Sequence, residues 1–400
     1  MMLRNWGLVA LGATLGMVSV APASAQSAVA IERSGHTLHV AACPHGNPNG
    51  TARCHAHIVT DTQGNPINGK ANPNAGTPSG YGPATLRAAY GTSSYAGSGT
   101  PTIAIVDAYG YANAERDLGV YRSQYGIPAC TTANGCFSKV SQNGGTNLPR
   151  EDTGWAQESA LDLDMASAMC PNCKIVLVEA TTNSFGNLAA AVAYAKTIPG
   201  VRAISNSYGG SDTGGTSYDS TYSANNIAIT ASTGDSGYGA QFPAAAPGVI
   251  AVGGTSLAAN GTETAWNGAG SGCGLSHAKP SWQAGVTDAC AGRMEADISA
   301  VADPNTGVAV YGPTSRRGSG WMVFGGTSAS APLIGAMFAL RNGTINAAQS
   351  IYSHTSNLTD VTSGSNGSSC PVNYYCHAGT GYDGPTGLGT PEGLGAMSTN

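Results

Sequence analysis

The stretch Gly325-Gly-Thr-Ser-Ala-Ser-Ala-Pro332, continued by Leu-Ile-Gly-Ala-Met-Phe-Ala-Leu340, decides how the rest of the chain is interpreted. The two glycines predict a tight turn, and the apolar run after it predicts a buried helix with Ser328 at its start. Pro332 is expected in the first turn of that helix, where a missing N–H costs least. A helix N-terminus offers unpaired N–H groups that favour negative charge. Ser328 is therefore a candidate nucleophile, and the alternative is a serine that only caps the helix.

The composition is poor in charge. Only 10% of the 400 residues are Asp, Glu, Lys or Arg, and the net charge is −5. Nucleic-acid-binding proteins carry basic clusters, so we expect no nucleic-acid partner. A chain with few charges suits acidic surroundings, because little repulsion develops when its carboxylates become protonated.

The N-terminus predicts secretion. Arg4 precedes an apolar run, residues 7–20, and Ala23-Ser-Ala25 follows as a cleavage site, so residues 1–25 are interpreted as a signal peptide. The run is too short for a membrane anchor, and we expect an extracellular or periplasmic protein. All 10 cysteines lie beyond Ala25, which favours disulfides. The close pairs suggest Cys43–Cys54, Cys130–Cys136, Cys170–Cys173, Cys273–Cys290 and Cys370–Cys376. The Cys170–Cys173 pair could instead be a redox or metal motif.

Two regions follow the signal peptide. Residues 26–78 are polar and rich in Gly, Pro and Asn, and are interpreted as an irregular N-terminal extension or short propeptide. From residue 79 to 400, short apolar strands alternate with helices, which predicts an α/β fold with a doubly wound, mainly parallel sheet and helices on both faces. The predicted strands are Thr102–Asp107, Lys174–Val178, Ala203–Asn206, Ile227–Ala231 and Val249–Val252, and the predicted helices are Trp155–Met169 and Phe185–Lys196.

A serine nucleophile needs a general base, and the eight histidines offer none in a His-Gly-Thr-His motif. The predicted helix after Trp155 offers carboxylates instead. Glu158 and Asp162 are four residues apart and share one helix face, where two like charges should titrate as a coupled pair. The alternative is a solvated acidic face, which the surrounding Leu, Met and Ala residues disfavour.

Glu158-x-x-x-Asp162, Ser328 in Gly-Gly-Thr-Ser, and Ser232-Thr-Gly-Asp-Ser-Gly237 occur in the order found in the sedolisin family, which this chain resembles over about residues 79–395. The resemblance implies a serine-carboxyl peptidase on a subtilisin-like fold. It implies that Glu158 is the general base, that Asp162 orients it, and that Asp235 supplies the oxyanion donor. Asp107 ends a strand and is interpreted as a structural carboxylate or an indirect partner of the site.

The same resemblance implies one structural calcium ion, Ca²⁺. Carboxylates and carbonyls in glycine turns are the hard oxygen ligands that calcium prefers. The matching positions are Asp360, Val361, Gly379, Gly381 and Asp383. The intervening loop carries Cys370 and Cys376, so its geometry could differ from that of the family.

The sequence thus predicts a monomeric, secreted peptidase that acts on protein or peptide substrates. Asp235 can donate to an oxyanion only when protonated, so we expect its pKa above that of Glu158 and an optimum below about pH 5.5. The alternatives are a catalytically silent binding protein on the same fold and a neutral subtilisin-type protease that uses an unassigned histidine. Side-chain preference, and endopeptidase against tripeptidyl-peptidase action, stay open.

Overall fold

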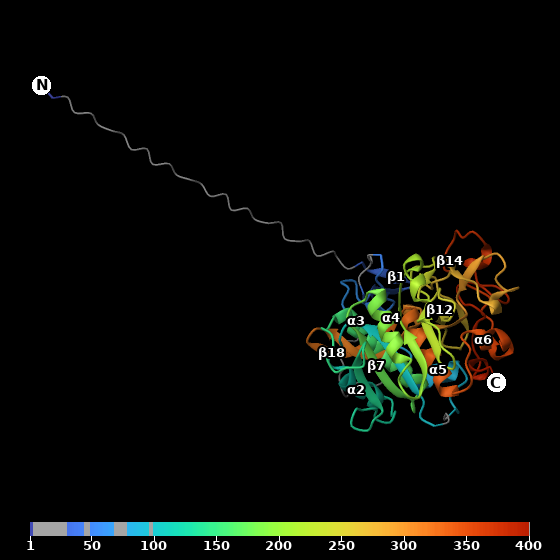
Figure 1. The fold of residues 1–400 in the computed structure, drawn as a ribbon, viewed down its shortest axis with the longest axis horizontal. Helices are drawn as coiled ribbons and strands as arrows, with labels where there is room; N and C mark the ends of the chain where they lie inside the picture. Colours follow the sequence, from blue (N-terminus) through green and yellow to red (C-terminus); the bar gives the residue numbers. More distant parts are fainter. Residues whose placement is uncertain (3–29, 44–48, 68–77, 96–98, 400) are drawn as a thin grey trace.

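The structure is a computed structural model that describes residues 1–2, 30–43, 49–67, 78–95 and 99–399 (Figure 1). The predicted signal peptide lies almost entirely outside the described residues. No helix among those residues is long and apolar enough to cross a membrane.

A mainly parallel sheet forms the centre of the molecule. Its strand order is β13-β12-β10-β8-β5-β7-β6, with β16 paired to β12, and every pairing is parallel except that of β12 with β13. The strands are β5 (Thr102–Ala108), β6 (Phe137–Ser141), β7 (Lys174–Ala180), β8 (Val201–Asn206), β10 (Ala228–Ser232), β12 (Ile250–Leu257), β13 (Glu263–Ala265) and β16 (Ile298–Val301).

Helices cover both faces of this sheet, because its central strands are apolar on both sides. In β5, Ile103 and Ile105 pack into a core with helices α3 (Thr153–Met169) and α5 (Thr327–Arg341). The alternate residues Ala104 and Val106 pack into a second core with α4 (Phe185–Ala195). The predicted doubly wound α/β architecture is confirmed. The shorter helices are α1 (Pro83–Ala89), α2 (Ala114–Gln124) and α6 (Gln349–Ser353), and the C-terminal residues pack against α6 (Figure 1).

The predicted elements of the sheet region occur within three residues of their expected ends, apart from β12, which runs on to Leu257. The predicted position of Pro332 in the first turn of its helix is wrong. Since α5 begins at Thr327, Pro332 lies in its second turn rather than its first. A proline there has no N–H to donate to the carbonyl of Ser328, four residues earlier.

The extension is not irregular, as the sequence had suggested. It forms strands β1 (Glu32–Ser34), β2 (Thr37–Ala41), β3 (Arg53–Cys54) and β4 (His57–Thr60). Strand β4 pairs with β18 (Gly318–Gly325), which leads into α5, so the order β1-β2-β4-β18-β17 makes a second sheet with β17 (Val308–Ser315). Strand β3 instead pairs with β9 (Tyr208–Ser211), whose other neighbour is β11 (Gln241–Phe242). The remaining pairs are β14 (Gly272–Ala278) with β15 (Gly292–Glu295) and β19 (Leu358–Thr359) with β20 (Thr390–Pro391).

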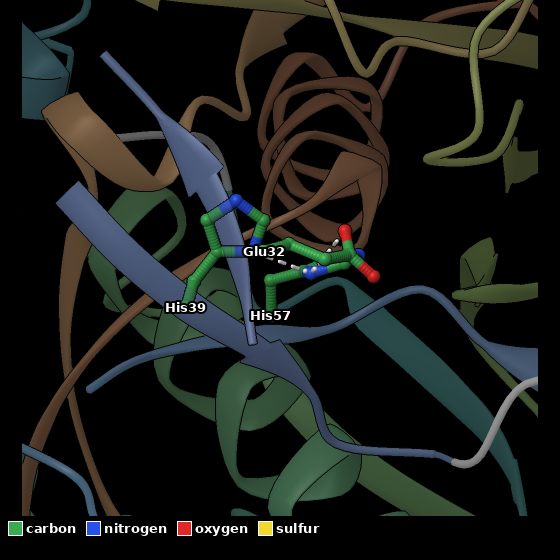
Figure 2. Close-up of side chains that lie close together, drawn as sticks. All are labelled: Glu32, His39 and His57. Carbon is green, nitrogen blue, oxygen red and sulfur yellow. Dashed lines mark hydrogen bonds and ion pairs between the residues drawn. The ribbon is translucent and has the colours of Figure 1, made fainter. Parts of the chain in front are cut away.

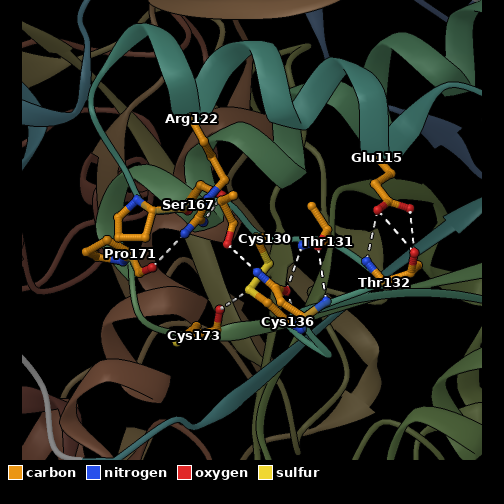
Figure 3. Close-up of a disulfide and its surroundings, with 12 residues drawn as sticks. Glu115, Arg122, Cys130, Thr131, Thr132, Cys136, Ser167, Pro171 and Cys173 are labelled. Carbon is orange, nitrogen blue, oxygen red and sulfur yellow. Dashed lines mark hydrogen bonds between the residues drawn. A yellow bond between two sulfur atoms is a disulfide. The ribbon is translucent and has the colours of Figure 1, made fainter.

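All five predicted disulfides are present, including Cys170–Cys173, which is therefore neither a free dithiol nor a metal site in this structure. Figure 3 shows the Cys130–Cys136 bridge beside α2. The buried Arg122 of that helix donates to Ser167 of α3 and to the Pro171 carbonyl, so α2 is tied to α3 and to the turn that follows it.

Candidate active site

The carboxyl ends of the central parallel strands meet at one edge of the sheet, where α/β folds commonly place their sites. Asp107 is the second-last residue of strand β5, Ser207 directly follows β8, and Asp235 lies shortly after β10. Helix α5 begins beside them after Gly326, whose φ of 97° is one that residues with a side chain rarely adopt. This turn brings Ser328, in the first turn of α5, to the same edge.

Helix α3 brings the two predicted carboxyl groups to this serine. Ser328 Oγ donates to the Ser207 carbonyl at 3.3 Å, and a hydrogen bond from Ser328 is one of the influences on the Glu158 carboxyl. Ser207 Oγ in turn donates to Asp162 Oδ1 at 2.7 Å. Asp164, on the other side of the helix, accepts from the Tyr311 N–H and takes no part in this group.

Burial dominates the protonation of these carboxyl groups. Glu158 and Asp162 are 0% exposed, and burial raises the pKa of each well above its usual value, with the charge of Asp107 acting in the same direction. Burial likewise raises the pKa of Asp107 itself to about 7. Because few negative charges can be held together in a closed space, this cluster retains protons above the pH at which exposed carboxyls lose them.

Asp235 is held differently. Its Oδ1 accepts from the Thr327 N–H and hydroxyl, each at 2.8 Å, and its Oδ2 lies 3.4 Å from Nε2 of His57. Burial acts to raise the pKa of Asp235, but hydrogen bonding and charge from His57, with the charge of His55, lower it below its ordinary value. The expected order, with the pKa of Asp235 above that of Glu158, is therefore wrong for this structure. The reason is a pair of histidines from the N-terminal extension.

The extension lies across the site as an extended segment. On one side, β3 pairs antiparallel with β9, matching Arg53 to Gly209 and Cys54 to Tyr208. On the other side, the Ala52 N–H donates to the Asn183 carbonyl at 2.8 Å, and the Asn183 side chain donates back to the Ala52 carbonyl at 2.6 Å. Residues 50–57, here called the covering segment, are therefore held by hydrogen bonds to the chain on both sides.

The peptide bond between His55 and Ala56 lies at Ser328. The His55 N–H donates at 3.3 Å to the same Ser207 carbonyl that Ser328 Oγ contacts. The Ala56 N–H donates to Glu158 Oε2 at 2.9 Å. A Cβ added at Gly326 would lie 1.8 Å from the His55 carbonyl oxygen and 2.8 Å from Asp235 Oδ2. The His55 carbonyl oxygen therefore lies against the start of α5, next to Asp235. Surface pockets of about 560 and 460 Å³ lie in other parts of the described chain, and Ser328 lines neither of them.

His57 also belongs to a polar cluster that covers Asp235 from outside. Figure 2 shows it with Glu32 and His39, the three residues coming from β4, β1 and β2. The two Nδ1 atoms lie 2.9 Å apart, and Glu32 Oε2 lies 3.9 Å from Nδ1 of His57. Burial and the charge of His57 lower the pKa of His39 to about 4. The cluster therefore places two buried imidazoles and one carboxylate side by side, next to Asp235.

Sequence reasoning missed the part played by His55, Ala56 and His57. Five of the eight histidines lie in the extension, and their crowding, as in Cys54-His-Ala-His57, was the one signal available. Among the described residues, the contacts of Ser328 Oγ are to Ser207 and Glu158, and His55 contacts Ser232 and Gln241 rather than Ser328.

The predicted calcium ligands come together near the C-terminus. The Gly381 N–H donates to Asp360 Oδ2 at 2.8 Å, and the Gly379 N–H donates to Asp383 Oδ2 at 3.1 Å. These bonds fold the glycine turn around two carboxylates, and the charge of Asp360 is one of the influences on the buried Asp383. Two neighbouring carboxylates, with the Val361 carbonyl next in the chain, form a donor set that fits a calcium ion.

Comparison with known proteins agrees with this geometry. A model of the subtilase family matches residues 144–369. Kumamolisin from Bacillus sp. (strain MN-32) is 31% identical over 373 residues, covering 81% of this chain and 64% of its own length. Sedolisin from Pseudomonas sp. (strain 101) is 27% identical over 364 residues, covering 79% of this chain and 60% of its own length. The chain thus spans less than two thirds of the length of either curated relative.

A solved structure of Pseudomonas sedolisin, described as a serine-carboxyl proteinase complexed with two molecules of pseudo-iodotyrostatin, superposes with a TM-score of 0.67 at 26% identity. The match covers 79% of this chain and 96% of that one. The subtilisin-like fold that the sequence predicted is therefore confirmed. The chain belongs to the subtilase family, and its resemblance to the sedolisins within that family, first indicated by its motifs, is confirmed.

Proposed function

We propose that this chain is a secreted serine-carboxyl peptidase that hydrolyses peptide bonds at acidic pH through an acyl-enzyme on Ser328. The observation that carries the proposal is the pairing of Ser328 with the buried Glu158, which Asp162 adjoins, where a conventional protease would have a histidine. Because burial and the charge of Asp107 raise the pKa of Glu158 well above its usual value, Glu158 accepts the serine proton in acid when the proton shared by the coupled carboxyl groups lies on its neighbour Asp162. We divide the chain into a signal peptide (1–25), the extension (26–78) and the peptidase domain (79–400).

The chemistry follows from the positions of these groups. Ser328 Oγ attacks the substrate carbonyl carbon while Glu158 takes its proton, and the tetrahedral intermediate carries its negative charge next to Asp235. Glu158 then returns the proton to the leaving amine nitrogen as the C–N bond breaks. Water then attacks the ester carbonyl carbon while Glu158 takes a proton from it. The proton returns to Ser328 Oγ as the ester bond breaks. Asp162 orients Glu158 and shares its proton, because the two carboxyl groups titrate together.

The acid requirement comes from Asp235, which can donate to the oxyanion only when protonated. While the covering segment is in place, His57 and His55 lower the pKa of this carboxyl. A substrate that replaces the segment also removes both histidines. Burial then acts against fewer opposing influences and raises the pKa of Asp235, which restores its ability to donate.

One calcium ion is proposed for the turn formed by Asp360, Val361, Gly379, Gly381 and Asp383. When bound, it would neutralise the two carboxylates and fix the loops that follow α6. This role is structural, because the turn is separate from the residues around Ser328. The proposed substrates are proteins or peptides, and the proposed state is a monomer.

The deciding experiment is a pH–activity profile of the purified protein on a denatured protein substrate. An optimum below about pH 5.5 supports the proposal, since an ordinary histidine base would be protonated and inactive at that pH. A neutral optimum would indicate a subtilisin-type protease with a histidine base. No hydrolysis at any pH, with the fold verified by circular dichroism, would indicate a binding protein on the same fold.

A further inference from the structure

One face of the extension carries, in register, three side chains of the kinds that bind metal ions. Strands β1 and β2 pair so that Glu32 lies directly opposite His39. Strands β2 and β4 pair so that Ala41, two residues after His39 and on the same face, lies opposite His57. Glu32, His39 and His57 are therefore direct or diagonal neighbours on one face of these strands (Figure 2).

The ligand atoms of these side chains lie at distances close to those around a metal ion. The two Nδ1 atoms are 2.9 Å apart, and all three atoms lie within 4.8 Å of one another. Around a tetrahedral zinc ion, ligand atoms at about 2.0–2.2 Å from the metal are about 3.3 Å from one another. The rings would separate by about 0.4 Å to reach this spacing. Glu32, whose side chain is 35% exposed, is free to rotate its oxygen toward them.

The hydrogen bond between the two rings uses the same atoms that a metal ion would use. One Nδ1 carries a proton and donates it to the lone pair of the other Nδ1. An ion in the place of that proton would accept a lone pair from both nitrogens. His39 and His57 are 3% and 1% exposed, so the ion would be enclosed by the rings and open to solvent only on the side of Glu32.

The second nitrogen of His57 has the partner that metal-binding histidines commonly have. Its Nε2 lies 3.4 Å from Asp235 Oδ2. A histidine that ligates a metal usually donates its other N–H to a carboxylate or carbonyl, which fixes the ring and makes the ligating nitrogen more basic. Trp266 packs against the same ring edge-on, with the ring centroids 6.2 Å apart. The contact with Asp235 is independent of the three ligand atoms and supports the same assignment.

We infer that Glu32, His39 and His57 form a zinc site, with water as the fourth ligand and with Asp235 as the outer partner of His57. Two imidazoles and one carboxylate suit Zn²⁺, whereas Ca²⁺ and Mg²⁺ prefer oxygen ligands alone. The site is therefore different in chemistry from the calcium turn proposed near the C-terminus. The inference does not depend on peptidase activity, and an inactive variant can test it.

A zinc ion at this position would join three strands of the extension. Its ligands come from β1, β2 and β4, and His57 is also the last residue of the covering segment. The bound ion would therefore hold the His57 ring against Asp235 and fix the covering segment in its place over Ser328. Since a ligand stabilises the state that binds it, zinc would favour the form of the protein in which this segment covers the site.

The first test is isothermal titration of Zn²⁺ into the full-length Ser328→Ala protein at pH 7.5, with calcium in excess so that the proposed calcium turn is not available to zinc. We expect one zinc ion per chain, and a Kd at least about 10-fold higher when His39→Ala or Glu32→Gln is added. His36→Ala, which removes an exposed histidine of the same hairpin, should leave the Kd unchanged. No zinc binding by the parent protein, or equal affinity in all four proteins, would overturn the inference.

Glu32→Gln is the decisive variant, because it keeps the size of a partly exposed side chain and leaves the buried rings in place. Circular dichroism verifies that each variant is folded. X-ray absorption of the zinc-loaded parent should show two imidazole nitrogens among the ligands, and a shell of oxygen atoms alone would contradict the assignment.

Two further measurements test the link to the active site. Asp235→Asn should raise the Kd for zinc about 10-fold, because the outer carboxylate is lost. An unchanged Kd would show that Asp235 is not the outer partner of His57. Zinc should also slow the amide hydrogen exchange of the covering segment in the parent protein, and unchanged exchange would contradict the stabilisation of this segment by the ion.

Discussion

At the scale of single residues, Ser328 has one role in the proposed mechanism that no neighbour can take over. It is buried at the start of α5, and its hydroxyl contacts the carboxyl that would activate it. We expect Ser328→Ala to lower kcat/KM by at least about 10⁴-fold, because no acyl-enzyme can form.

The matched control is Ser330→Ala in the same helix. Ser330 is equally buried, but its hydroxyl donates to the Thr327 carbonyl inside the helix. This variant should keep its activity, and both variants should keep the wild-type circular dichroism spectrum. Substantial hydrolysis by pure Ser328→Ala would remove the serine from the mechanism.

Asp235 determines the alkaline side of the pH profile in the proposed mechanism. The carboxyl donates only in its protonated form, so activity is lost as pH rises through its pKa in the substrate complex. An amide donates at every pH. Asp235→Asn should therefore lower the maximal rate but move the alkaline limb to higher pH, as measured by kcat across pH 3–8.

The surface variant Asp288→Asn serves as the control for charge alone and should keep the wild-type profile. An Asp235→Asn profile with the same shape as wild type would show that another group titrates.

The motif residues were predictable because each motif is local. Glu158 and Asp162 share a helix face by their spacing, and Gly-Gly-Thr-Ser predicts its own turn and helix start. The pKa order was not predictable in the same way. It depends on His57, which lies 178 residues before Asp235 in the sequence and reaches it only through the pairing of β4 with β18.

At the scale of elements, the glycine turn around Asp383 is the part of the fold where we propose a bound calcium ion. A ligand that binds only the folded state stabilises it, by about 2.7 kcal/mol at 100 times its Kd. We expect Asp383→Ala to lose bound calcium and to lower Tm by about 5 °C or more in excess calcium.

Chelation of wild type should lower Tm by a similar amount, and Asp61→Ala, on an exposed turn, should not. Elemental analysis of active wild type that finds no calcium would rule the site out.

The elements themselves divide into two groups by how well the sequence predicts them. The apolar strands and helices of the central sheet carry their own signal, since each is buried on both faces and reads as a continuous apolar run. Strands β1 to β4 are only two to five residues long. They are strands because β4 pairs with β18 and β3 pairs with β9, while β1 and β2 extend the sheet from β4. Their partners lie far away along the chain, so no local pattern reveals the pairing.

At the scale of the whole molecule, buried carboxyl groups make the fold dependent on acid. Burial raises the pKa of Asp107 to about 7 and those of Glu158, Asp162, Asp164 and Glu295 well above their usual values. Between the unfolded and folded pKa values the native state holds more protons than the unfolded chain, so stability falls as pH rises. Raising the pKa of Asp107 from its usual value to about 7 corresponds to about 4 kcal/mol.

We therefore expect Tm of the inactive Ser328→Ala protein to fall by several degrees between pH 4.5 and pH 7.5 at constant calcium. Differential scanning calorimetry checks this expectation. Asp61, Asp235, His39 and His55 act in the opposite direction, because their folded pKa values are lowered. They are four groups against eight carboxyls, since the pKa values of Glu179, Glu263 and Asp383 are raised as well. A Tm that rises or stays constant over this range would contradict the expectation.

The covering segment also determines how well a free peptide can compete for the cleft at Ser328. A tethered peptide is present at its own binding site at an effective concentration in the millimolar range, however dilute the protein is. A free peptide in the micromolar range therefore competes poorly for this cleft while the covering segment occupies it. Because the competing peptide belongs to the same chain, dilution does not weaken it, so the occupancy of this cleft by the covering segment should be the same in dilute and in concentrated solution.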